Sequence, residues 1–348
     1  MRSAIRNPRF WLGLLVSLAA LAYAVHGVSW PDLLTALGTA NYAWLAPGLA
    51  VILAGQAARA IRWRALFGQA PRPDAVHAFQ ILSLGYMVSA ALPFRLGDPL
   101  RAWLVETRTH GDGAAAWATI LAGRIIDLLA IAVLVAVIVP SQSSRLLAER
   151  FGPGPWSDPT RLALLALGLL ALAYCGLLVA AAVGPGLVTL VARSSRRLGA
   201  SPRTAVRLGA AAGRFAEGFA PLRRPATLAQ VAVWTLAVWL LGAASNWVFL
   251  RAFVPDAPFG TALVVLGTTA VFAILPSSPS YAGVFHSGVV VALASVGGTA
   301  RSTALAYAIV LHGVTTATLI VVGIACLWAI GLSRRDLGRG LQEAAPTG

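Results

Sequence analysis

Long apolar runs recur along the whole chain, and they constrain the fold more than any other feature. A run of about 20 residues crosses a hydrocarbon core of about 30 Å as a helix. The six strongest runs are Phe10–Val28, Tyr42–Ala58, Ala115–Val139, Leu162–Val183, Leu228–Phe249 and Thr303–Leu332. Only 11% of the residues are charged, about half the fraction in an average soluble domain. We therefore predict an all-α, polytopic transmembrane helical bundle that forms a single domain over residues 1–348, without a soluble catalytic domain.

Two weaker apolar stretches, Val76–Pro93 and Phe259–Val296, are interrupted by Pro, Gly and Ser. Arginines indicate their direction, because loops on the cytoplasmic side are enriched in basic residues. Basic clusters precede the first span, follow the second, fill residues 185–224 and follow the last span. Counting spans between these clusters requires each weak stretch to start and end on one side. We predict about six full spans plus two oppositely oriented re-entrant hairpins, with both termini in the cytoplasm. We expect the membrane to be the cytoplasmic (inner) membrane of a bacterium.

Residues 185–224 are the most basic part of the chain. They carry eight of its 27 basic residues, all of which are arginine, against a single acid, Glu217. An Arg-rich amphipathic segment is typical of a helix on a membrane surface. We predict a cytoplasmic helix here that contacts anionic inner-leaflet lipids. The formal charge of +15 then follows from topology, and it does not require nucleic acid as a partner.

The two weak stretches resemble each other. The first contains Leu84-Gly85 and Leu92-Pro93 followed by Gly97; the second contains Leu266-Gly267 and Leu275-Pro276 followed by Pro279 and Gly283. One opens to the inside and the other to the outside, as an inverted repeat requires. Broken helices at corresponding positions in two halves of a transporter indicate a substrate site near the membrane midplane.

The segment Arg95-Leu96-Gly97-Asp98-Pro99-Leu100-Arg101 is the densest polar cluster in an apolar setting. Charged groups at membrane depth are costly and are usually functional. We expect Arg95 and Arg101 to bind a phosphate through their planar guanidinium groups, with Asp98 orienting one of them. The alternative is an ordinary cytoplasmic loop whose charges meet water.

Two further groups of arginines are candidates for the same site. Arg124 and Asp127 lie three residues apart on one helix face, and they either contact the substrate or form an ion pair within that helix. Arg59 and Arg62, beside Trp63, end the second span. They either contact a headgroup directly or lie at the membrane interface, as Arg and Trp commonly do.

His286 and His312 are candidates for proton coupling, because histidine titrates near neutral pH. A packed, hydrogen-bonded role is the commoner one for a single histidine in a bundle. Cys175 and Cys326 lack metal-ligand spacing. We find no Ser/His/Asp triad, paired catalytic carboxylates, metal motif or nucleotide loop. We therefore expect no cofactor, no metal and no direct use of ATP.

These motifs together resemble the flippase-like family that includes the transmembrane part of lysylphosphatidylglycerol synthases. The similar blocks are Arg59 with Arg62-Trp63, Gly85-Tyr86, Leu92-Pro93 with Arg95, Gly97-Asp98 and Arg101, then Arg124 with Asp127, and Leu275-Pro276 with Pro279. They cover about residues 50–330 in the family's order. The resemblance implies a membrane protein that moves a lipid between leaflets.

The chain departs from the family pattern at four positions. Where the family usually has Glu, this chain has Asp98, Gly123 and His286, and Ser280 stands where the family favours Gly. The aminoacyl-transfer domain of the synthases has no counterpart in these residues, so we do not expect this chain to transfer lysine to lipid.

The sequence thus predicts an inner-membrane lipid translocator for a lipid with an anionic or phosphate-bearing headgroup, and not an enzyme. One alternative is a non-transporting partner of envelope lipid enzymes; another is a membrane-embedded headgroup transferase. The candidate protein partners are a second copy of the chain and an envelope-lipid enzyme.

Overall fold

The computed structural model describes residues 8–68, 71–92, 96–109, 111–138, 184–199, 201–275 and 277–333, together with Asp336 and Gly338. The α-helices are α2 Pro8–Val25, α3 Trp30–Thr39, α4 Leu45–Leu66, α5 Ala75–Ala91, α6 Gly97–Arg108, α7 Gly113–Ile138, α10 Gly184–Arg197, α11 Pro202–Glu217, α12 Pro225–Leu250, α13 Phe259–Phe272, α14 Val284–Val296 and α15 Arg301–Ala329. Short 3₁₀ turns are η1 Tyr42–Trp44, η4 Ala220–Arg223 and η5 Pro279–Tyr281. Within these ranges all regular structure is helical, which confirms the predicted all-α class.

Among the described residues, four helices are long and apolar enough to cross a membrane. They extend over Tyr42–Leu66, Gly113–Val135, Pro225–Leu250 and Arg301–Ala329. The first predicted span, Phe10–Val28, corresponds to α2, which is followed by α3 after a bend of 85°. Ser29 caps α3, and Pro31 follows within its first turn, so the chain turns sharply there. The predicted span Leu162–Val183 lies outside the described residues.

The second weak stretch, Phe259–Val296, forms two helices separated by a break, as predicted, whereas the first, Val76–Pro93, forms a single helix and its hairpin is completed by a second helix beyond Pro93. The first pair is α5 and α6; the second is α13 and α14. Gly97 is the first residue of α6 and Gly283 is the N-cap of α14, so the two glycines occupy corresponding places. Gly97 also lies against the backbone of Gly85, because neither residue has a side chain to separate α5 from α6.

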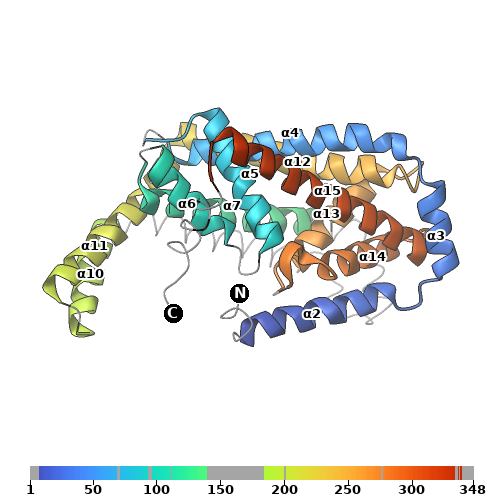
Figure 1. The fold of residues 1–348 in the computed structure, drawn as a ribbon, viewed down its shortest axis with the longest axis horizontal. Coiled ribbons are helices and arrows are strands. Elements are labelled where there is room, and N and C mark those ends of the chain that lie inside the picture. Colours follow the sequence, from blue (N-terminus) through green and yellow to red (C-terminus); the bar gives the residue numbers. More distant parts are fainter. Residues whose placement is uncertain are drawn as a thin grey trace.

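The two hairpins open at opposite ends of the bundle (Figure 1). At one end, which we call the basic end, Gly68 after α4 contacts Pro221, and Gly218 after α11 contacts Ala115 of α7. The first hairpin begins and finishes at this end. At the far end, the Asn41 amide donates to the Ala252 carbonyl over 2.9 Å, and the second hairpin begins and finishes there.

Helix packing follows the inverted repeat. The series α4 to α7 corresponds to the series α12 to α15, and α4 packs along α12. In each series the spanning helix contacts the first hairpin helix, and the second hairpin helix contacts the next span. Across the two halves, α5 packs on α15 and α13 packs on α7. These reciprocal contacts are those expected for two halves related by an approximate two-fold axis.

Two apolar clusters hold the halves together. The cluster at the basic end includes Leu84, Leu100 and Leu104, and the cluster at the far end includes Phe249 and Tyr307; all five side chains are fully buried. Since α6 contributes Leu100 and Leu104 to the first cluster, the polar residues of its first turn are held by a packed helix.

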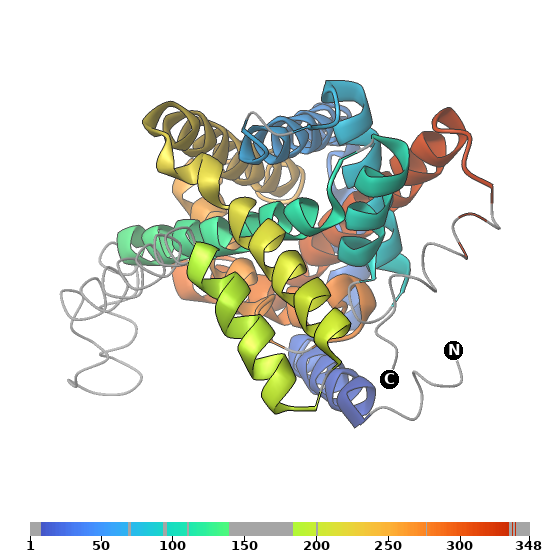
Figure 2. The same cartoon turned by 90° about the vertical axis from the view of Figure 1, so that its left-hand side faces the viewer.

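The Arg-rich segment differs from the single helix that we predicted. It forms the antiparallel pair α10 and α11, which projects from the basic end of the bundle (Figure 2). Gly199 has φ +87° and reverses the chain, and Ser201 caps α11 just before Pro202. These turn and cap signals, together with close contact of Gly209 with Val188, explain why two helices form where the charge pattern alone indicated one.

Candidate functional site

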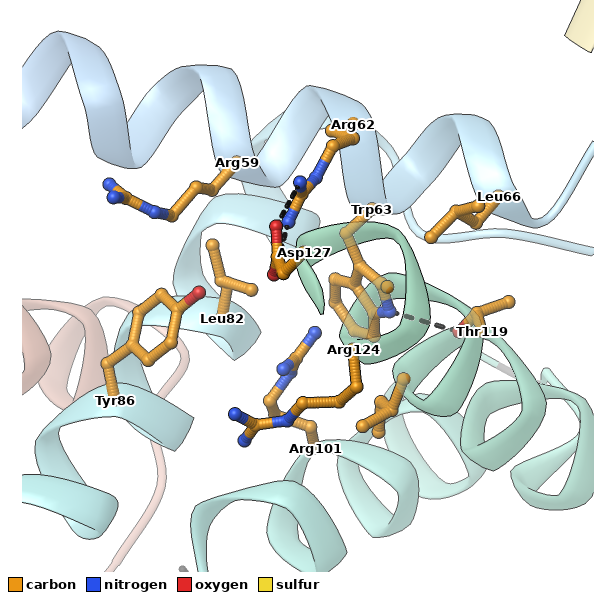
Figure 3. Close-up of a pocket in the computed structure, with 12 residues that line it drawn as sticks. Arg59, Arg62, Trp63, Leu66, Leu82, Tyr86, Arg101, Thr119, Arg124 and Asp127 are labelled. Carbon is orange, nitrogen blue, oxygen red and sulfur yellow. Dashed lines mark hydrogen bonds and ion pairs between the residues drawn. The ribbon is translucent and has the colours of Figure 1, made fainter. Parts of the chain in front are cut away.

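A small cavity of about 60 Å³ lies between the first hairpin and two spanning helices. Side chains from α4, α5, α6 and α7 converge on it (Figure 3). Its lining consists of Arg59, Arg62, Trp63, Leu66, Leu82, Tyr86, Arg101, Thr119, Ile120, Gly123, Arg124 and Asp127. Arg62 is about one turn from the end of α4, so the cavity lies between the basic end and the middle of the bundle. Four of its lining residues are arginines.

Arg62 of α4 forms a two-pronged ion pair with Asp127 of α7. Its Nη1 and Nη2 atoms donate to the two carboxylate oxygens over 2.6 and 3.0 Å. The Arg62 side chain is only 8% exposed, and such bidentate pairs are among the strongest hydrogen-bonded contacts in proteins. Arg62 therefore joins α4 to α7. Its burial contradicts the interfacial interpretation, which placed it and Trp63 at headgroup level.

Asp98 of α6 is shared by two arginines. Arg124 of α7 donates to one carboxylate oxygen over 2.6 Å, and Arg101 of α6 approaches the other at 3.4 Å. The ion pair within α7 that we considered for Arg124 and Asp127 is therefore wrong. Each of the two residues instead pairs with another helix, because the first hairpin and α4 approach α7 from different sides.

Arg101 is buried without full compensation of its charge. It is 7% exposed, and its guanidinium lies 4.3 Å from the centre of the Trp63 ring, a favourable cation–π geometry. Trp63 is fixed by donating its indole N–H to Thr119 over 3.0 Å. Among the described residues, Arg101 Nε has no hydrogen-bond partner. The Nε atom is itself buried, so the charge of Arg101 is only partly compensated, by Asp98 and by the Trp63 ring.

Gly85 explains how Arg101 reaches this position. A Cβ atom at residue 85 would lie 2.5 Å from Arg101 Cδ, so only glycine leaves room for the aliphatic part of the side chain. Tyr86, the next residue, lines the cavity from α5. The Gly85-Tyr86 pair, which carried part of the family resemblance, thus has a direct steric and polar role here.

The cavity is open on one side. The side chains of Arg124 and Asp127 are 42% and 38% exposed, whereas Arg101 behind them is buried. Arg59 lies half-buried at the cavity wall, and no ion pair joins it to another described residue. A ligand can therefore approach past Arg124 and reach Arg59 and Arg101.

Charge in and around the cavity is unbalanced. The described residues contribute the four guanidinium groups of Arg59, Arg62, Arg101 and Arg124 against the two carboxylates of Asp98 and Asp127. This is a formal excess of two positive charges. Uncompensated buried charge is unfavourable, so the arrangement favours binding of an anion.

The two candidate histidines lie beside the turn of the second hairpin, His286 in the first turn of α14 and His312 in α15. Their rings are 5.0 Å apart. His312 Nε2 lies 2.8 Å from the Ser280 carbonyl oxygen, and the Gly283 amide donates to His286 Nδ1 over 3.3 Å. These contacts place the protons of the neutral rings on His312 Nε2 and His286 Nε2. Both histidines are thus hydrogen-bonded and packed, and His312 Nδ1 is the ring atom at which a further proton would bind.

Backbone geometry at this turn is unusual. Ser280 and Tyr281 both have φ 60°, a region that residues other than glycine seldom adopt. Ser280 Oγ also contacts Thr316 of α15 over 3.0 Å, and η5 packs against α5 of the first hairpin. The turn of the second hairpin therefore packs against the first helix of the first hairpin, and the predicted turn residues Pro93 and Pro276 lie outside the described residues.

The structure brings together most of the residues proposed from the sequence. Arg59, Arg62, Asp98, Arg101, Arg124 and Asp127 all lie at one cavity or pair with a residue that lines it. Arg95, for which we predicted a phosphate contact, lies outside the described residues. Pro279, Gly283 and His286 belong to the second hairpin, and His312 faces its turn from α15. Thr119 was missed, although its four-residue spacing from Gly123 and Asp127 places the three on one face of α7.

Apolar spanning helices, two broken helices and a buried arginine cluster define a multi-pass membrane protein built around a polar interior site. The family model described as the lysylphosphatidylglycerol synthase TM region matches residues 10–323. The chain therefore belongs to this family, which confirms the resemblance inferred from the motifs.

A curated relative carries a name from glycan chemistry. The chain is 23% identical over 350 residues to glycosyltransferase AglD of Haloferax volcanii, and the match covers 96% of this chain and 56% of that protein. The chain thus spans about half the length of this relative. No solved structure matches it significantly.

Proposed function

We propose that this protein is a lipid translocator of the bacterial inner membrane, with both termini in the cytoplasm, that moves a lipid with an anionic headgroup between leaflets. The headgroup binds at the arginine cavity while its hydrocarbon chains stay in the bilayer. The observation that carries this proposal is Arg101, a buried guanidinium with a partly compensated charge at the back of a cavity open on one side.

The position of the cavity supports transfer across the membrane. It lies where the first hairpin breaks, and the turn of the second hairpin packs on the same helix, α5. A headgroup that leaves the aqueous surface must exchange water for other hydrogen-bond donors. Arginines at a break between two oppositely directed hairpins provide such donors between the two ends of the bundle.

The α10–α11 pair supports a role at an anionic surface. Arg193, Arg196 and Arg197 of α10 are all exposed, and Leu190 and Leu198 are exposed apolar residues beside them. Basic amphipathic helices bind anionic lipid surfaces through this combination of charge and apolar area. We propose that the pair holds the basic end at the inner leaflet, near the lipids that are to be moved.

A headgroup transferase remains the enzymatic alternative, since the named relative is a glycosyltransferase. Asp98 is the candidate acid or base for it. However, both Asp98 oxygens already face guanidinium groups, at 2.6 Å (Arg124) and 3.4 Å (Arg101), so neither oxygen is free to contact a substrate. Translocation is therefore the function that this geometry supports better.

Reconstitution into liposomes tests the proposal. Tail-labelled phosphatidic acid and tail-labelled phosphatidylglycerol would be followed by bleaching with a membrane-impermeant reductant. We expect faster loss of inner-leaflet label without ATP, and about tenfold slower movement for Arg101→Gln and Arg59→Gln, equivalent to ~1.4 kcal/mol. Arg108→Gln, an exposed position on the same helix as Arg101, is the charge-matched control. A new lipid product with unchanged leaflet distribution would instead support the transferase alternative.

A further inference from the structure

We infer that the arginine cavity selects a phosphomonoester headgroup, which carries about two negative charges, over phosphodiester and zwitterionic headgroups. This inference rests on the proposed translocator function and adds the chemical class of the substrate. It is carried by the charge balance of the cavity and by the positions of its unpaired donors.

The formal excess of two positive charges gives the first reason. Asp127 is fully engaged by Arg62, and Asp98 is shared by Arg101 and Arg124. A phosphodiester carries a single charge and would leave one guanidinium uncompensated. A zwitterionic headgroup, or one that bears an amino group, would leave both uncompensated and would add a cation beside four arginines. A phosphomonoester ionised twice balances the excess.

The free donors give the second reason. Arg59 has no ion pair among the described residues, Arg101 lines the cavity with only a 3.4 Å contact to Asp98, and Arg124 is partly exposed at the opening. They come from α4, α6 and α7, and all three line the cavity (Figure 3). A phosphomonoester offers three terminal oxygens, one for each of these guanidinium groups, whereas a phosphodiester has only two non-bridging oxygens.

The opening of the cavity gives the third reason. A phosphomonoester has one substituent, which can extend out of the cavity through the open side past Arg124 while the three terminal oxygens face inward. A diester has a second substituent that must also be accommodated. The inner wall at this point consists of Arg101, Trp63 and Thr119, all at least nine-tenths buried, so a second substituent directed inward would meet packed side chains.

Protonation of the ligand provides a specific readout. The second pKa of a phosphomonoester is about 6, whereas a phosphodiester stays singly charged through this range. Affinity for a monoester should therefore rise as the pH increases from 5 to 7.5, and affinity for a diester should stay nearly constant. Guanidinium groups remain protonated throughout this range, so the change reports the ligand.

The experiment uses the full chain in a neutral maltoside detergent, with binding measured by thermal shift and by isothermal titration. The probes are dihexanoyl phosphatidic acid, dihexanoyl phosphatidylglycerol and inorganic phosphate. We expect phosphatidic acid to bind about tenfold more tightly than phosphatidylglycerol at pH 7.5, and this ratio to approach one at pH 5. Each melting temperature is compared with that of the ligand-free protein at the same pH.

Variants link the preference to the cavity. Arg59→Gln removes a guanidinium that forms no ion pair with another described residue. The variant should therefore fold normally and lose most of the preference for phosphatidic acid. Arg108→Gln on α6 should retain the preference. Equal affinity for the two lipids, a preference unaffected by pH, or a preference that survives Arg59→Gln would each overturn the inference. Tighter binding of inorganic phosphate than of phosphatidic acid would show that the ligand is free phosphate and would overturn it too.

The outcome separates this inference from the proposed function. Selective binding of phosphatidic acid without movement of either labelled lipid in liposomes would contradict translocation and leave the selectivity intact. Movement of phosphatidylglycerol as fast as phosphatidic acid would contradict the selectivity and leave translocation intact.

Discussion

Arg124 of α7 donates to Asp98 of α6 over 2.6 Å, and this contact joins the first hairpin to a spanning helix at the point where the hairpin breaks. Because Asp98 also faces Arg101, a single carboxylate orients two of the guanidinium groups that we assign to headgroup binding. The ion pair therefore combines a structural role with a role in shaping the site.

Replacing Asp98 tests this double role. Asp98→Asn leaves Arg101 buried beside Trp63 without its carboxylate, and it removes the charge partner of Arg124. We expect a loss of ~2 kcal/mol in stability, below the usual 3–5 kcal/mol for a broken buried pair because the Arg124 side chain is 42% exposed. Thermal unfolding in detergent measures it. The double variant Asp98→Asn with Arg124→Gln should recover part of this stability without recovering lipid movement. Full stability in Asp98→Asn alone would show that the pair is dispensable.

The two glycines of the first hairpin should respond differently to an added methyl group. Gly97→Ala places Cβ against the backbone carbonyl of Gly85 and against Ser89, so α5 and α6 must separate, at a cost of ~3 kcal/mol. Gly85→Ala meets mainly the Arg101 side chain, which can move away. We expect Gly85→Ala to keep most of its thermal stability and to lose lipid movement as Arg101→Gln does. Gly38→Ala in α3, where a Cβ meets nothing within 4 Å, is the control.

The cap of α5 gives a prediction about acid stability. The His77 backbone amide donates to Asp74 over 2.8 Å, and this bond, followed by the contact with the His77 side chain, holds the pKa of Asp74 below its ordinary value. A lowered pKa in the folded state means that the stabilisation is present above the ordinary carboxyl pKa and is lost as the pH falls through the folded value. We expect Asp74→Ala to lower stability by ~1 kcal/mol at pH 7 and to flatten the melting temperature between pH 5 and 3. An unchanged acid profile would contradict the role of this cap.

The two histidines differ in their expected contribution to proton coupling. Two imidazolium rings 5.0 Å apart would repel each other strongly in an apolar interior, so the pair holds at most one added proton. His286 Nδ1 already accepts from Gly283, whereas His312 donates through Nε2 and keeps Nδ1 for a proton. We expect lipid movement to respond to a pH gradient across liposomes, and this response to disappear in His312→Gln but persist in His286→Gln. Loss in neither variant would exclude coupling through this pair.

The sequence was sufficient for the helical class, the two broken helices and most of the arginine site. Those features depend on long apolar runs, on glycine and proline punctuation, and on charges that are costly in an apolar setting. The predicted side-chain partners were wrong for residues whose actual partners lie on other helices. A spacing of three residues suggested a pair between Arg124 and Asp127. Spacing along one helix cannot predict contacts between helices, and tertiary packing pairs Arg124 with Asp98 and Asp127 with Arg62 instead.

Burial was also hard to predict from position along a span. Arg62 and Trp63 lie near the end of α4, where arginine and tryptophan commonly face the interface. The structure buries both, because α5 and α7 pack against α4 and α7 provides Asp127 and Thr119 as partners. The bend between α2 and α3 and the reversal at Gly199 were missed for a different reason, since each depends on a short turn signal within a longer apolar or basic stretch.

The last prediction concerns the opposite directions of the two hairpins. Arg72 precedes α5 and Thr107 lies at the end of α6, both at the basic end; Asp256 precedes α13 and Ala300 precedes α15, both at the far end. Single cysteines at these four exposed positions, in a chain whose Cys175 and Cys326 are first replaced, can be labelled with an impermeant thiol reagent in intact cells. Since arginine-rich loops face the cytoplasm, we expect labelling from outside at positions 256 and 300, and labelling at 72 and 107 only after the cells are opened. The paired positions make the test specific to re-entrant geometry. If positions 72 and 107 were labelled from opposite sides, α5 would cross the membrane alone, the inverted repeat would be broken, and the arginine cavity would no longer lie at the turn of a hairpin.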